Sequence, residues 1–218
     1  MTNVTSLHTT QERQQELTDP LNLVVLRHWE QLRGERPAPD RKELDLRVLA
    51  PALRWFGILE RRDSELRYDW RLAGSELCEM WGHELRGTEA MTGMPRFERD
   101  TMLRLFDRVI TTCQPALMRL SLKIGFAERR CPAEALALPL ADERTGRLLV
   151  AFMLVPHCPP GIPCRPVIED AELHFLRLIW TEPVPGHAQP QLPPRSPVVR
   201  RKGVFTVIEG GRDRSRNG

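Results

Sequence analysis

The segment from residue 66 to residue 72 carries the pattern that most narrows the choice of folds. Its apolar residues occupy every second position: Leu66, Tyr68, Trp70 and Leu72. Side chains of a β-strand point alternately to its two faces, so this spacing predicts a strand with one buried face. The apolar segment 53–60 precedes it across the turn-like residues 61–65, and together the two segments predict an antiparallel hairpin.

Further strands and helices follow in a definite order. Strands are predicted at 116–124, 131–140 and 147–155, the last two joined by a turn at 142–146. Helical segments are predicted at 19–33, 45–50, 74–81 and 96–113. Hairpin-connected strands with helices grouped between them indicate an α+β fold. We expect a five-stranded antiparallel sheet with helices on one face, an N-terminal flanking helix and a C-terminal extension.

Composition divides the chain into four parts. Residues 1–18 are polar and predict a flexible leader, and residues 19–156 hold the predicted domain. Proline becomes frequent after residue 155, so residues 157–182 are predicted to be a proline-rich linker with a short helix. Residues 183–218 predict a basic, largely disordered tail. The short helix is predicted at 169–180, from an apolar stripe with helical spacing: Leu173, Leu176 and Ile179.

Charge and cysteine content indicate the compartment. The net charge of +3 is too small to imply a nucleic-acid partner, although the tail is basic. The five cysteines are odd in number and include no CxxC pair, which predicts reduced thiols in the cytosol. The N-terminus lacks a signal-peptide pattern, and no apolar run is long enough to span a bilayer. We therefore expect a soluble, cytoplasmic protein without membrane contact.

Short motifs occur in an order that resembles one known family. They lie at 29–36, 43–46, 49–53, 67–75, 82–87 and 134–140. Together they resemble the signature of a bacterial family of small stand-alone PAS-domain proteins, over residues 21 to 155. His83 and Glu84 depart from the basic–acidic pair of the family's loop. The resemblance implies a PAS fold and a regulatory role in signal transduction, and it implies no particular ligand.

Two groups of residues are candidate binding sites. A small molecule held between sheet and helices is expected to contact inward side chains: Trp70, Leu72, Met80, Met102, Phe106, Leu136 and Leu138. A filled hydrophobic core would use the same residues. Arg33, Arg36 and Arg41 lie beside the first helix and, if they converge, suit an anionic metabolite or an acidic partner. Local salt bridges are the alternative. The apolar stripe of the first helix also suggests a homodimer through that helix.

The sequence offers no recognisable catalytic, cofactor or metal motif. It contains no G-x-S-x-G, P-loop or G-x-G-x-x-G pattern, and the helix at 96–113 contains no histidine that could ligate haem. Cys78 lies outside a flavin-binding context, and His157, Cys158 and Cys164 form an incomplete set of zinc ligands. We therefore expect no cofactor, no metal and no enzymatic activity.

Three functions remain open on the sequence alone. The first is a sensory or regulatory module that acts through contact with a signalling partner, with or without a small-molecule ligand. The second is a nucleic-acid-associated protein that uses the basic tail. The same tail holds an apolar segment at 204–208, which suits a short strand or a docking peptide. The third is an enzyme on a PAS scaffold, which would require a deep polar pocket.

Overall fold

The computed structural model describes residues 17–62, 66–124, 130–158 and 166–179. The helical elements are α2 (Pro20–Arg33), η1 (Arg41–Glu43), α3 (Leu46–Leu49), η2 (Leu53–Trp55), α4 (Ser75–Trp81) and α5 (Arg96–Thr112). The strands are β1 (Phe56–Arg61), β2 (Tyr68–Ala73), β3 (Ala116–Ile124), β4 (Arg130–Asp142), β5 (Arg147–Pro156) and β6 (Pro166–Leu178). Residues 1–16 of the predicted leader 1–18 and the tail beyond residue 182, with its segment 204–208, lie outside the described residues. The last two residues of the predicted leader belong to the fold instead, because Leu17 is buried and Thr18 is hydrogen-bonded to Glu134.

The strands form one antiparallel sheet in the order β2-β1-β5-β4-β3-β6. The α+β prediction is confirmed, but the sheet has six strands rather than five, because the segment predicted as a helix at 169–180 forms most of β6. The register of β6 against β3 shifts at Arg119/Leu120, where Leu173 and Phe175 pair with successive residues. This bulge places Leu173 and Leu176 three positions apart on one face, which imitates helical spacing.

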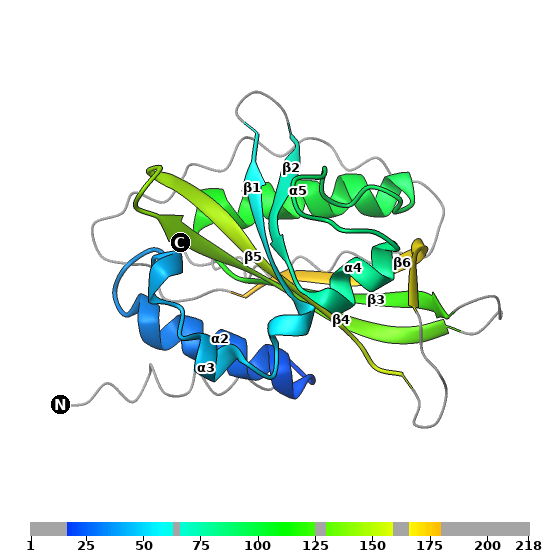
Figure 1. The fold of residues 1–218 in the computed structure, drawn as a ribbon, viewed down its shortest axis with the longest axis horizontal. Coiled ribbons are helices and arrows are strands. Elements are labelled where there is room, and N and C mark those ends of the chain that lie inside the picture. Colours follow the sequence, from blue (N-terminus) through cyan, green and yellow to red (C-terminus); the bar gives the residue numbers. More distant parts are fainter. Residues whose placement is uncertain (1–16, 63–65, 125–129, 159–165, 180–218) are drawn as a thin grey trace, which may run out of the picture.

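Helices cover both sides of the sheet. Figure 1 shows α2 and α3 on one side and α5 on the other. We call the side under α2 the outer face and the side under α4 and α5 the inner face. Each face has its own hydrophobic core: Trp29 and Leu138 are buried on the outer face, and Trp70 and Phe106 on the inner face. Helix α2 is therefore the predicted flanking helix, and it packs on the domain's own sheet.

Local sequence explains where α2 begins and ends. The Asp19 carboxylate accepts hydrogen bonds from the backbone N–H groups of Leu21 and Asn22, at 2.8 and 3.0 Å, and Pro20 occupies the first helical position. Gly34, at φ 53°, ends the helix in a conformation that glycine tolerates best. The predicted helix boundaries are confirmed.

A buried glutamate of β4 fixes this helix start to the sheet. Glu134 Oε2 accepts hydrogen bonds from Thr18 N and Thr18 Oγ1 at 3.0 and 2.8 Å, and its Oε1 accepts from Asp19 N at 3.1 Å. Asn22 Nδ2 donates to the same Oε1 at 3.2 Å. One carboxylate thus meets several donors at the helix N-terminus, where negative charge is favoured. The first turn of α2 is thereby tied to the middle of the sheet.

No helix among the described residues is both long and apolar enough to cross a membrane.

Candidate ligand and partner sites

A cluster of aromatic rings occupies the inner face. Tyr68 contacts Phe106 with ring centroids 5.6 Å apart, and Phe106 contacts Phe152 at 5.5 Å. Trp70 extends the cluster to Phe152 at 6.0 Å and to Trp81 at 5.7 Å. All four pairs meet edge to face, the geometry that aromatic quadrupoles prefer. The rings pack between the sheet and the helices α4 and α5.

Methionine is the second component of this core. Five of the chain's seven methionines are buried on the inner face: Met80, Met91, Met94, Met102 and Met118. Methionine side chains are unbranched and polarisable, so they adapt to occupants of different shape. The inner face thus combines rigid rings with deformable side chains, a lining that suits a small apolar ligand as well as a filled core.

The Trp70 indole N–H has no hydrogen-bond partner among the described residues, and the Tyr68 hydroxyl has none in good geometry, although the Arg61 side chain lies within its reach. The side chains of Tyr68 and Trp70 are almost completely buried. Burial raises the pKa of Tyr68 strongly, the charge of Asp107 adds to the increase, and Arg61 opposes it. Buried polar groups without partners are rare in folded proteins and mark places where water or a ligand would be stabilised.

The predicted pocket residues divide between the two faces. Trp70, Met80, Met102 and Phe106 lie together on the inner face, where they are part of the hydrophobic core. Leu136 and Leu138 lie on the outer face under α2, because strand alternation turns Ala135 and Ala137 inward. That part of the predicted pocket is wrong.

Leu72 also leaves the predicted pocket, because β2 contains an irregularity. Trp70 pairs with Leu59 and Leu72 pairs with Ile58, so the ladder skips Arg71. The extra residue reverses the alternation, and Leu72 sits beside Ile58, which packs on the outer core. The Leu72 side chain is 47% exposed there. The period of two that predicted the strand therefore misplaced its last residue.

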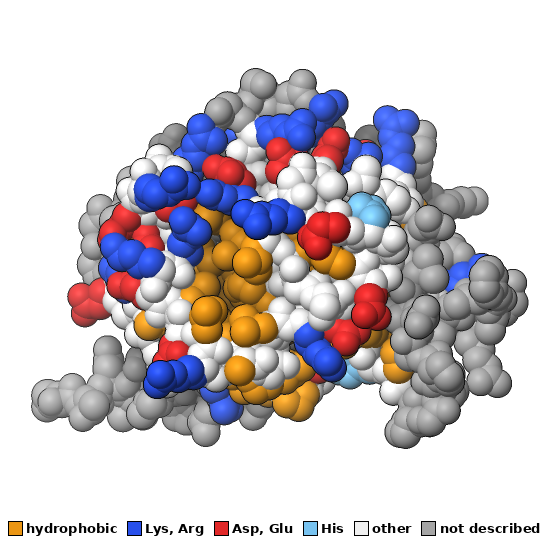
Figure 2. All heavy atoms as spheres, in the orientation of Figure 1, with side chains coloured by type: hydrophobic (Ala, Val, Ile, Leu, Met, Phe, Trp, Pro, Cys, Tyr) orange, Lys and Arg blue, Asp and Glu red, His pale blue; other side chains and the backbone are white. Residues whose placement is uncertain are grey.

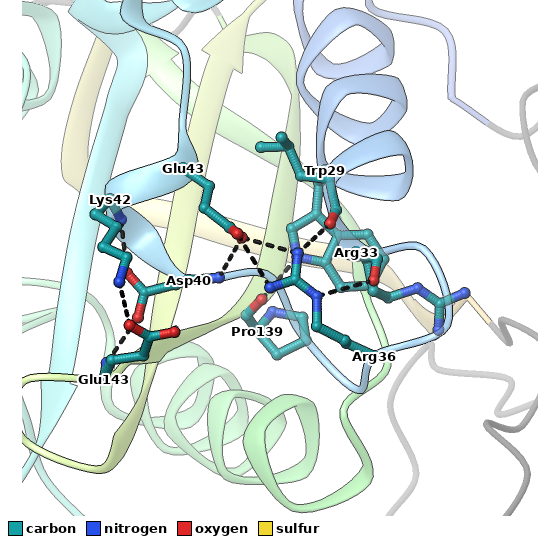
Figure 3. Close-up of polar contacts among 9 residues, drawn as sticks. Trp29, Arg33, Arg36, Asp40, Lys42, Glu43, Pro139 and Glu143 are labelled. Atoms are coloured by element: carbon teal, nitrogen blue, oxygen red, sulfur yellow. Dashed lines mark hydrogen bonds and ion pairs between the residues drawn. The ribbon is translucent and has the colours of Figure 1, made fainter.

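The three arginines of the predicted anion site do not converge. Arg36 pairs with both carboxylate oxygens of Glu43, at 3.1 and 2.8 Å (Figure 3). The Arg33 guanidinium lies over the Trp29 ring, 5.3 Å from its centroid. Arg41 lies 3.2 Å from Asp142. Each guanidinium has its own intramolecular partner, so local contacts, the alternative considered above, account for this motif.

The end of α2 and the segment that follows it, up to Glu43, are held against the β4–β5 hairpin by polar contacts (Figure 3). Trp29 Nε1 donates to the Pro139 carbonyl at 2.7 Å. The Asp40 carboxylate caps η1 and also accepts from Glu143 N at 2.6 Å. Lys42 pairs with the Glu143 carboxylate. The motif that begins at Trp29 and the one that ends at Leu140 therefore touch each other, and both serve the fold.

A network of ion pairs lies next to these contacts. Asp142, only 2% exposed, lies 3.1 Å from Arg71 and 3.2 Å from Arg41. Glu60 lies 3.5 Å from Arg71 and 3.7 Å from Arg147. Sequence patterns did not reveal this network, because its members come from η1, β1, β2 and the β4–β5 hairpin.

The cysteines differ from the expected set of five reduced thiols. Cys158 is disulfide-bonded, whereas Cys131, whose sulfur lies 3.9 Å from that of Cys158, is a free thiol. Burial raises the pKa of Cys131, Cys78 and Cys113, which disfavours the reactive thiolate. Cys164 lies outside the described residues. Within the described part of the chain, no three His, Cys, Asp or Glu residues gather as metal ligands would.

Comparison with known proteins agrees with this architecture. A family model for the PAS domain matches residues 18–153, more than half of the chain. No curated protein and no solved structure matched the chain. The matched range starts at the anchor of α2 and ends within β5, so β6 lies beyond it. PAS domains serve as sensory and regulatory modules. The chain belongs to the PAS domain family.

Proposed function

We propose that this PAS domain regulates another protein by direct contact rather than by catalysis. Support comes from the outer layer, where large apolar side chains are exposed. Leu46 and Val48 of α3 are 63% and 42% exposed, and Val24 of α2 is 37% exposed. We call these three residues the α2–α3 surface.

Helices α2 and α3 meet beside the residues of the α2–α3 surface. Asp45 N, at the start of α3, donates to His28 Nε2 at 3.0 Å, and Val24 lies one helical turn before His28. Figure 2 shows hydrophobic side chains gathered in the middle and lower part of this view, where Figure 1 shows β1, β5 and α2. Charged side chains border them above. An apolar surface with a polar rim is typical of a protein interface.

Site-specific photo-crosslinking tests this proposal. A photoreactive amino acid at position 46 is compared, in cells that express the chain naturally, with the same residue at position 66. Leu66 is a second exposed leucine, outside the α2–α3 surface. We expect one reproducible protein adduct from position 46 and none from position 66. An adduct of twice the chain's mass would identify the partner as a second copy, the homodimer suggested by the sequence. Equal labelling from both positions would refute the proposal.

A second candidate function is the sensing of a small apolar molecule by the inner face. The Trp70 N–H, which has no partner among the described residues, and the buried Tyr68 hydroxyl favour it, because they place polar groups among adaptable methionines. Native mass spectrometry of freshly purified protein should then show extra mass that is lost on denaturation. Tyr68→Phe should lower the bound fraction while leaving the fold intact. A native mass equal to the denatured mass would argue against this function.

A further inference from the structure

An elongated groove runs between α5 and the last strand. Its volume is about 510 Å³, and one wall consists of residues from successive turns of α5. From Phe97 to Arg108 this wall extends about 16 Å along the helix axis. Leu176 and Leu178, alternate residues of β6, form the opposite wall. The groove therefore exists because residues 166–178 form a sheet strand beside α5.

The groove exposes large apolar side chains. Phe97 is 60% exposed and Leu176 is 43% exposed. Leu105, which also lines the groove, is 5% exposed and belongs to the inner core. The groove thus has an apolar base connected to the protein core and partly exposed apolar rims. Covering such surface is favourable in proportion to the area removed from water.

Two arginines line the same groove. Arg104 and Arg108 are both exposed, lie one helical turn apart on α5, and make no side-chain hydrogen bond or ion pair with any described residue. The lining also includes Asp100, whose carboxylate lies 3.8 Å from Arg96. The groove therefore carries an excess of positive charge beside its apolar walls, and guanidinium groups pair well with carboxylates.

We propose that the α5–β6 groove binds a short acidic and apolar segment of a partner protein. Leucine or phenylalanine side chains of the segment pack against Phe97 and Leu176, and its carboxylates pair with Arg104 and Arg108. The spacing fits a peptide. Residues four apart on a helix lie about 6 Å apart, and alternate side chains of an extended chain lie about 7 Å apart. This groove is separate from the α2–α3 surface, so either proposal can fail alone.

Peptide selection followed by charge exchange tests the groove. A phage library of short random-sequence peptides is selected on the full-length protein, and the enriched peptide is measured by fluorescence anisotropy. We expect enriched sequences that combine Asp or Glu with Leu or Phe. Arg104→Glu with Arg108→Glu should weaken binding by about tenfold or more, and Leu176→Asp should do likewise. The double variant should instead bind the same peptide with its acids replaced by lysine.

Matched controls separate the groove from general charge effects. Arg144→Glu makes the same charge change at an exposed arginine of the β4–β5 turn, and Leu66→Asp repeats the leucine change elsewhere. Both controls should leave the affinity unchanged. The proposal is wrong if no peptide is enriched, if the enriched peptides lack acidic residues, or if the groove variants bind as well as the controls. Self-association that the double variant abolishes would assign the groove to a second copy of the chain and overturn the proposal.

Discussion

Glu134 shows how a residue of a family motif serves the fold. It is 2% exposed, and its two oxygens accept the donors of Thr18, Asp19 and Asn22 at the start of α2. Glu134→Gln replaces one acceptor by a donor and removes the charge, so we expect a loss of about 2 kcal/mol in the free energy of unfolding. Urea denaturation measures it. Glu143→Gln, which removes only an exposed partner of Lys42, should change little.

The same carboxylate predicts acid sensitivity. Burial alone would raise the pKa of Glu134, but the hydrogen bonds from Thr18, Asp19 and Asn22 outweigh burial and hold the pKa below its ordinary value. A lowered pKa in the folded state stabilises the protein above the unfolded pKa of about 4.3, and this stability is lost as the pH falls through the folded pKa. The stability gap between wild type and Glu134→Gln should therefore shrink in acid. A gap independent of pH would contradict this role.

Tyr68 permits an unusually clean titration, because it is the chain's only tyrosine. Burial raises its pKa, so the folded protein should form tyrosinate only at a pH well above about 10, the value for an exposed tyrosine. The raised pKa contributes stability below pH 10 that is lost as the pH rises further. Tyrosinate absorbance of folded and urea-unfolded protein measures both values. Coincident titration curves would show that the hydroxyl reaches solvent.

At the scale of elements, β6 is where sequence reasoning failed. Leu173 is 3% exposed in the inner core, whereas Leu176 is 43% exposed. If the segment is a sheet strand, Leu173→Ala should cost about 2–5 kcal/mol, while Leu176→Ala should cost much less. Chemical denaturation of the two variants measures the contrast. Equally small losses of stability in both variants would mean that Leu173 is not packed in the inner core.

The junction between β2 and α4 depends on Gly74. A Cβ atom at this position would lie 2.2 Å from the Leu53 carbonyl oxygen and 2.4 Å from that of Arg54. Both are backbone atoms that cannot move aside without shifting η2. Gly74→Ala should therefore lower stability by about 1–3 kcal/mol. Gly87→Ser is a useful contrast, since its site has open space and the cost would come from its φ of 81° alone. A Gly74→Ala variant as stable as wild type would contradict this close approach.

Across the whole molecule, local patterns predicted most elements but not how they face each other. Capping residues at Asp19 and Gly34 and the periodicity of 96–113 predicted helices correctly, because those signals are local. The face of each β4 side chain depends on which helix covers which side, and alternation within one strand cannot decide that. The irregularity in the β1–β2 pairing places Leu72 on the outer face. The bulge in the β3–β6 pairing gives the apolar residues of β6 a helical spacing, so the segment was predicted to be a helix. The α5–β6 groove could not be predicted while β6 was assigned as a helix.

The two faces of the sheet carry different features. The inner face holds the aromatic and methionine core, and the outer face carries α2, α3 and their exposed apolar residues. The sheet separates the two layers. A conformational change in the inner core can therefore reach the α2–α3 surface only by moving strands of the sheet. We expect the regulatory contact to depend on Leu46 even when the inner core is untouched.

Native mass spectrometry of the chain, isolated at its natural expression level, tests this central claim most directly. We predict that the wild-type chain carries a stoichiometric protein partner, that Leu46→Asp releases it, and that Leu66→Asp retains it. A wild-type chain found only at the monomer mass, or a complex that survives Leu46→Asp, would contradict regulation through the α2–α3 surface.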